Sequence, residues 1–189
     1  MKIAAAIGIP VVIVLILLSI GFSSYNGLVT SQEVARTAWS QVENQYQRRA
    51  DLIPNLVETV KGFASQERTV FEEVTRLRSQ WGQAVSKGDL PSRMEAARGL
   101  DSALSRLLVV VERYPELKSN QNFLTLQAQL EGTENRISVE RKRFNDAVLS
   151  YNTKMRTYPG AWFASMFGFE RMPLFEAEKG AQEVPRVKF

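Results

Sequence analysis

The chain has 189 residues, with 24 basic and 20 acidic side chains and a formal net charge of +4, a length that suits one domain and an anchor. It contains neither Cys nor His, which excludes disulfides, thiolate nucleophiles, cysteine metal sites, lipid attachment through Cys, and the commonest general base and metal ligand. The interspersed charges indicate a solvated helical surface, and we expect no nucleic-acid partner.

An uncharged run of 20 residues, Ile3 to Phe22, opens the chain. A run of this length crosses a hydrocarbon core of about 30 Å, so residues 1–25 are predicted to form a transmembrane anchor in contact with membrane lipid. A cleaved signal peptide is the alternative interpretation. Lys2 precedes the run, and Arg36 is the first basic residue after it. The positive-inside tendency therefore favours a single-pass protein of the inner membrane with its body on the periplasmic or extracytoplasmic side.

Residues 26–160 show apolar positions at helical spacing without strand-like alternation. The first predicted helix covers residues 28–49, with Leu28, Ala35, Trp39, Val42 and Tyr46 on one stripe. Asp51 and Pro54 suggest a new helix start, which places the second helix at 52–87. The third is placed at 93–113, because Gly88 and Pro91 precede a capping-box pattern of Ser92 and Glu95.

The fourth predicted helix, residues 116–158, carries apolar residues at intervals of seven: Phe123, Leu130, Ile137, Phe144, Tyr151 and Tyr158. A seven-residue repeat stays on one face only when the helix supercoils against partners. The predicted fold class is therefore all-α: an N-terminal transmembrane helix followed by an up-and-down four-helix bundle with long helices.

Residues 161–189 form an aromatic C-terminal segment and irregular tail, in which Trp162, Phe163, Met166, Phe167 and Phe169 crowd together. One interpretation is a cap on the end of the bundle. The other is an interfacial or partner-docking segment.

Several motifs resemble the LemA family. They are Tyr25-Asn26-Gly27-Leu28-Val29, Ala38-Trp39-Ser40-Gln41-Val42, the run from Arg48 to Phe63 (RRADLIPNLVETVKGF), Tyr114-Pro115-Glu116-Leu117-Lys118 and Thr133-Glu134-Asn135-Arg136-Ile137. The resemblance runs from the membrane segment to the tail. It implies a bacterial membrane-anchored four-helix bundle without a settled biochemical activity, acting as a scaffold or accessory protein. Some members are encoded near membrane quality-control proteases.

Polar residues give no convergent chemical site in the sequence. Arg48, Arg49, Asp51 and Asn55 form a candidate recognition site, or else a turn and a helix cap. Glu134 and Arg141 are seven apart, which allows a buried or a solvated ion pair. Neighbouring Glu72 and Glu73 diverge around a helix, whereas Glu131 and Glu134 lack further oxygen ligands. We expect no enzyme activity, no metal and no cofactor.

Two functions therefore remain open. The first is a non-enzymatic scaffold that self-associates into a homo-oligomer through long amphipathic helices at the membrane surface. The alternative is an adaptor that docks clients or partners to a membrane protein, such as a quality-control protease. Its expected contact is the aromatic segment with Trp162, Phe163, Phe167 and Phe169.

Overall fold

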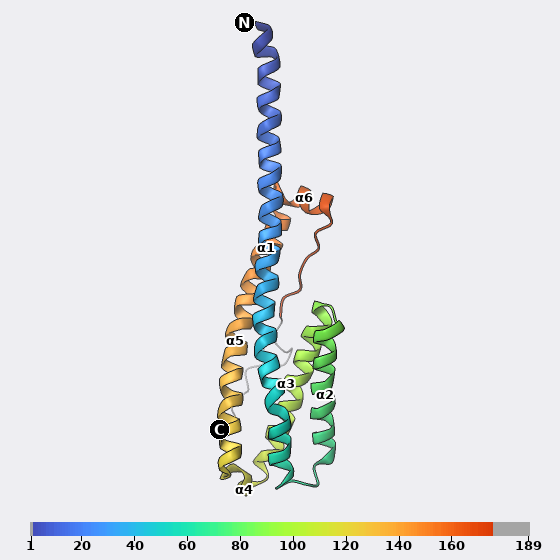
Figure 1. The fold of residues 1–189 in the computed structure, drawn as a ribbon, viewed down its shortest axis with the longest axis vertical. Coiled ribbons are helices and arrows are strands. Elements are labelled where there is room, and N and C mark those ends of the chain that lie inside the picture. Colours follow the sequence, from blue (N-terminus) through green and yellow to red (C-terminus); the bar gives the residue numbers. More distant parts are fainter. Residues whose placement is uncertain (1, 176–189) are drawn as a thin grey trace, which may run out of the picture. The chain divides into compact units, whose positions relative to one another are not determined.

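The computed structural model describes the backbone of residues 2–175 and the side chains from residue 10 onwards; this part of the chain is helical and contains no strand. The helices are α1 (Lys2–Lys61), α2 (Arg68–Lys87), α3 (Leu90–Glu112), α4 (Pro115–Lys118), α5 (Gln121–Arg156) and α6 (Gly160–Phe167) (Figure 1). The predicted all-α class is confirmed. The up-and-down order of a four-helix bundle stays a prediction, and the tail beyond Phe175, with Pro185, lies outside the described residues.

The helices divide between two compact units. Unit 1 contains the chain up to Ala38 and from Arg143 onwards, and unit 2 contains Trp39–Lys142. The long helices α1 and α5 contribute to both units, whereas α2, α3 and α4 belong to unit 2 and α6 to unit 1.

The start of α1 is long and apolar enough to cross a membrane. Its large apolar side chains from Val11 to Phe22 are exposed in the protein alone. Such a run of exposed apolar side chains is more stable in lipid than in water, because most of its surface is left uncovered by the described part of the chain. The segment therefore fits a membrane anchor.

The predicted helix break between residues 49 and 52 is wrong, because α1 continues through Pro54 to Lys61. A proline inside a helix cannot donate to the carbonyl four residues earlier, which here is Ala50 O. Arg78 on α2 replaces the missing donor: its Nε donates to Ala50 O at 3.0 Å. A tertiary contact thus satisfies the carbonyl that Pro54 leaves without a helical partner.

The first helix ends instead at Lys61, and residues 62–67 form the turn into α2. Val60 O accepts hydrogen bonds from the backbone N–H of both Phe63, at 3.0 Å, and Ala64, at 2.9 Å. The second predicted helix therefore belongs partly to α1 and partly to α2. Apolar side chains before, within and after the turn are buried: Ile53, Val57, Val60, Ala64, Phe71, Val74 and Trp81.

Helices α2 and α3 form a hairpin through Gly88 and Asp89 (Figure 1). The cap of α3 is Asp89, whose Oδ1 accepts from Ser92 N at 3.0 Å, so the predicted capping role of Ser92 is corrected. The hydrogen bonds from Ser92 lower the pKa of the Asp89 carboxyl from its usual value, because they favour the ionised form.

The seven-residue seam of α5 is almost entirely buried: Phe123, Leu130, Ile137, Phe144 and Tyr151 are each less than a tenth exposed. Tyr158 is 88% exposed, because α5 ends at Arg156 before reaching it. The predicted start at residue 116 is also corrected. The short helix α4 precedes a new start at Asn120, whose Oδ1 accepts from Phe123 N at 3.1 Å.

Candidate membrane-interface and partner-binding sites

In unit 1, the short helix α6 packs against the C-terminal end of the apolar segment of α1 (Figure 1). The rings of Tyr25 and Phe167 meet edge to face with centroids 4.9 Å apart, and Phe169 lies 5.9 Å from Tyr25 in the same manner. Gly21 allows the ring of Phe163 to come close, because a Cβ there would lie 3.2 Å from Phe163 Cζ. The aromatic segment therefore docks on the end of the apolar segment of α1 that fits a membrane anchor.

An apolar groove of about 560 Å³ lies between these two elements. Its walls include Leu17, Leu18 and Gly21 from α1, and Trp162, Phe163 and Met166 from α6. Trp162, Met166 and Phe167 remain more than half exposed, while Phe163 and Phe169 are half-buried. The predicted partner-binding aromatic residues are thus brought together, and their binding of a partner stays a prediction.

The segment that follows α6 is fastened to α5 by two asparagines. Asn152 Nδ2 donates to Met172 O at 2.8 Å and Asn152 Oδ1 accepts from Met172 N at 3.1 Å. Asn145 holds Phe175 in the same way, with distances of 2.9 and 2.8 Å. Asn145 and Asn152 are seven residues apart on α5, a rise of about 10 Å. Met172 and Phe175 are three residues apart in extended chain, which also spans about 10 Å. The two asparagines can therefore bind these two residues at the same time.

Tyr151 adds a third link to this fastened segment, which runs from Phe169 to Phe175. Its hydroxyl donates to Glu170 O at 2.9 Å. Burial raises the pKa of this hydroxyl above its usual value, because the phenolate is poorly solvated there. Sequence reasoning treated this segment as irregular; the available signal was the seven-residue spacing of Asn145 and Asn152 on α5.

The candidate recognition residues Arg48, Arg49, Asp51 and Asn55 do not converge. Arg48, Asp51 and Asn55 are exposed on α1, where Asp51 Oδ1 accepts from Gln47 Nε2 at 2.9 Å. Arg49 is only 4% exposed and points into the interior of unit 2, where it pairs with Asp101. The four residues therefore do not form one site, and their role in partner binding stays a prediction.

Arg49 instead belongs to an ionic network inside unit 2. Its Nη1 donates to Asp101 Oδ1 at 2.6 Å and its Nη2 to Glu134. Asp101 also accepts from Arg141 and, at 2.8 Å, from the hydroxyl of Tyr46. Two arginines and two carboxylates make the network neutral, as burial requires. The Tyr46 ring lies 5.8 Å from the guanidinium carbon of Arg49 and 5.3 Å from that of Arg141.

The network explains the seven-residue spacing of Glu134 and Arg141. The two residues are linked through Arg49 and Asp101, which lie on α1 and α3. Sequence reasoning missed Asp101. The available signal was an acidic residue that directly follows Leu100, a residue of the buried stripe of α3. The network joins α1, α3 and α5, and an ionic network of this kind fixes how neighbouring helices align along their length.

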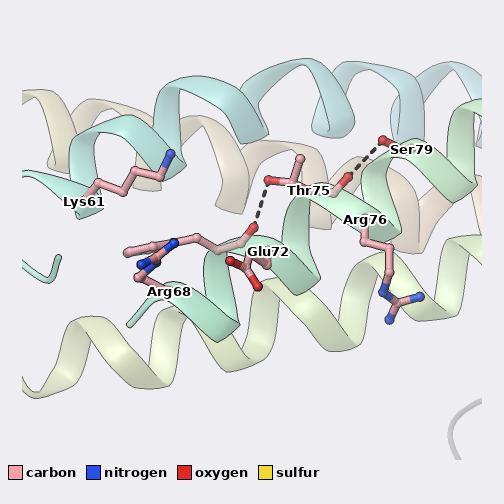
Figure 2. Close-up of a pocket in the computed structure, with 7 residues that line it drawn as sticks. Lys61, Arg68, Glu72, Thr75, Arg76 and Ser79 are labelled. Carbon is pink, nitrogen blue, oxygen red and sulfur yellow. Dashed lines mark hydrogen bonds between the residues drawn. The ribbon is translucent and has the colours of Figure 1, made fainter. Parts of the chain in front are cut away.

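A second, polar hollow of about 480 Å³ lies on unit 2, along α2 (Figure 2). Lys61 from the end of α1 and Arg68, Glu72, Thr75, Arg76 and Ser79 from α2 line it, with Phe71 beneath. Thr75 Oγ1 donates to Phe71 O at 2.8 Å and Ser79 Oγ to Thr75 O at 3.1 Å. Sequence reasoning did not single out this hollow, because its basic residues are spread over two helices.

The carboxylates considered for catalysis do not meet. Glu73 pairs with Arg106 at 2.6 Å, whereas Glu72 lines the hollow. Glu131 accepts from Gln127 and Glu134 from Arg49. Among the residues that the structure describes, no group of three or more acidic side chains is placed to hold a metal ion.

Comparison with known proteins gives a consistent relationship. The model of the LemA family matches residues 38–189. The magnetosome protein MamQ of Magnetospirillum gryphiswaldense is 28% identical over 186 residues, covering 86% of this chain and 68% of the relative, and MamQ 2 of Paramagnetospirillum magneticum matches equally well. Protein LemA of Metamycoplasma hominis is 23% identical over 162 residues, covering 86% and 71% of the two chains. The chain is therefore a member of the LemA family.

Proposed function

We propose that this LemA family member is a non-enzymatic, membrane-anchored adaptor whose unit 2 binds an acidic segment of a partner protein in the hollow along α2. One observation carries the proposal. Arg68 and Arg76 line the hollow, and neither makes an ion pair within the described part of the chain. Guanidinium groups of this kind suit carboxylates, which they bind in a two-pronged geometry.

The spacing of the two arginines defines the expected partner. Arg68 and Arg76 are eight residues apart on α2, which is about 12 Å along the helix. An extended peptide spans that distance with about four residues. Glu72 lies between the two arginines and disfavours a third acidic group at the centre. The hollow therefore suits an extended segment with two acidic residues about four positions apart.

Self-association through the long helices has less support. The seam of α5 that would drive it is buried within a single chain from Phe123 to Tyr151. A seam that is already covered within one chain is not available to a second copy. A homo-oligomer stays the alternative, and light scattering on the detergent-solubilised chain, after size-exclusion chromatography, distinguishes it from a monomeric adaptor.

The names of the relatives and the family resemblance suggest where a partner is found. Three relatives are named as magnetosome proteins, and the resemblance points to membrane quality-control proteases as a partner class. We further propose that the anchor lies in the inner membrane with unit 2 exported, because Lys2 precedes the span and no basic residue follows it before Arg36.

Affinity purification in mild detergent, followed by identification of co-eluting proteins, tests the adaptor role. The double variant Arg68→Glu and Arg76→Glu should lose a protein that the natural chain retains, because two attractive contacts become repulsive. Arg136→Glu is the matched control, since Arg136 is also exposed and its substitution leaves the hollow unchanged. If the double variant and the control retain the same proteins, or if only the chain itself is recovered, the proposal is wrong.

A further inference from the structure

We propose that α6 lies in the lipid interface of the membrane and that the groove between α6 and α1 holds an acyl chain of a phospholipid. This inference goes beyond the adaptor role and does not depend on it. It begins with composition: α6 is an uncharged helix of eight residues, GAWFASMF, and only Ala164 is buried. Trp162, Met166 and Phe167 are exposed, a set of side chains that favours the boundary between headgroups and acyl chains.

The wall opposite α6 identifies the occupant of the groove. That wall is the apolar segment of α1 itself, from Val14 to Tyr25. A transmembrane helix is surrounded by acyl chains, so the groove opens directly into lipid. Eleven residues of helix rise by about 16 Å, which matches the roughly 15 Å of hydrocarbon in one leaflet. The groove therefore has the length, volume and apolar lining for one acyl chain.

A basic side chain stands where the headgroup of that lipid would lie. Lys154 Nζ contacts Gly27 O at 3.5 Å, and Gly27 follows the last residue of the apolar run, Phe22, by about 8 Å along the helix. The polar layer on one side of a bilayer is about 5 to 8 Å thick. An ammonium group at that level attracts the phosphate of an anionic phospholipid.

Close packing shows that the groove is built rather than accidental. Gly21 lies against Phe163, where a Cβ would come within 3.2 Å of the ring. The Tyr25 ring closes the end of the groove against Phe167. Asn145 and Asn152 fasten the chain that leaves α6 to α5, which shortens the free length of chain after α6.

Fluorescence of the full chain in vesicles of phosphatidylglycerol and phosphatidylcholine with brominated acyl chains tests the position of α6. Trp162 is the exposed member of the three tryptophans, while Trp39 and Trp81 are buried in unit 2. Bromine should therefore quench the Trp162 component of the emission, and Trp162→Phe should abolish the quenching. Iodide in the water should leave this component unchanged. Quenching by iodide, or by neither reagent, would overturn the proposal.

A photoreactive acyl chain tests the groove itself. A phosphatidylglycerol with a diazirine in its acyl chain should form adducts on α6, mapped by mass spectrometry to residues such as Met166. Gly21→Leu should reduce these adducts several-fold, because the larger side chain enters the space beside Phe163. Gly132→Leu is the matched control, since Gly132 also lies on a helix, a Cβ there meets no atom within 4 Å, and it is remote from the groove in sequence and lining. Equal adduct yields in both variants would show that lipid only surrounds α6 and does not occupy the groove.

Discussion

Ala50 O accepts a hydrogen bond from Arg78 Nε at 3.0 Å, where Pro54 removes the helical donor. We predict that Arg78→Met lowers the free energy of unfolding by about 1 to 2 kcal/mol, because a partly buried carbonyl loses its partner. The loss should be less than half as large in a Pro54→Ala background, where residue 54 supplies its own N–H. Urea unfolding of the four chains of this double-mutant cycle measures both values.

Arg76→Met is the control for this cycle. It makes the same chemical change on the same helix at an exposed position and should alter stability by less than about 0.5 kcal/mol. Equal effects of Arg78→Met with and without Pro54 would show that the guanidinium does not replace the helical hydrogen bond.

The ionic network of unit 2 predicts unequal effects of its two carboxylates. Asp101→Ala leaves Arg49, which is 4% exposed, without its main partner and should cost about 3 kcal/mol. Glu134→Ala removes a carboxylate whose side chain is 57% exposed, and the water-screened pair should be worth less than about 1 kcal/mol. Thermal unfolding of both variants measures the difference. Similar losses in the two variants would contradict the assignment of Asp101 as the centre of the network.

Periodic apolar positions were enough to predict the all-α class and most of the core. Leu28, Ala35, Trp39, Val42 and Tyr46 were predicted on one stripe and are all buried. Their burial follows from helical spacing alone, so tertiary information was not needed. The prediction of the membrane segment also needs only local sequence, since it depends on the length of one uncharged apolar run.

Helix boundaries were harder to predict because some depend on distant side chains. Pro54 suggested a helix start, and only the donation by Arg78 to Ala50 O, between residues 28 positions apart, explains why α1 continues. The candidate site shows the same limit. Arg49 was grouped with its neighbour Arg48, yet consecutive residues point about 100° apart on a helix. The partner of Arg49, Asp101, lies 52 residues away.

The fastened segment after α6 can be released selectively. Asn152→Ala removes both hydrogen bonds to Met172, which corresponds to about 1 to 2 kcal/mol of local stability. Hydrogen exchange at the Met172 amide should therefore accelerate by roughly 10-fold. Asn135→Ala is the control, because Asn135 is exposed on the same helix. Unchanged exchange at Met172 in Asn152→Ala would show that the asparagine does not hold this segment.

Tyr151 predicts a loss of stability at alkaline pH. Burial raises the pKa of its hydroxyl above the usual value of 10.0, so the folded chain keeps its proton at a pH where the unfolded chain has lost it. The contribution of Tyr151 is complete below pH 10.0 and declines as the pH rises from there through the folded pKa. Tyr151→Phe should be less stable at neutral pH, since it loses the bond to Glu170 O, but its melting temperature should fall less between about pH 9 and 11. Parallel pH profiles of the two chains would contradict this.

The membrane orientation can be tested directly because the chain has no cysteine of its own. Thr69→Cys introduces one thiol at an exposed position on α2, within unit 2. If unit 2 is exported, a maleimide that cannot cross the membrane should label this thiol in intact spheroplasts as fully as after detergent lysis. The natural chain is the blank, and a cytoplasmic cysteine protein in the same cells checks that the membrane is sealed. Labelling only after lysis would place unit 2 in the cytoplasm and reverse the orientation, because one Lys before the span is a weak topogenic signal.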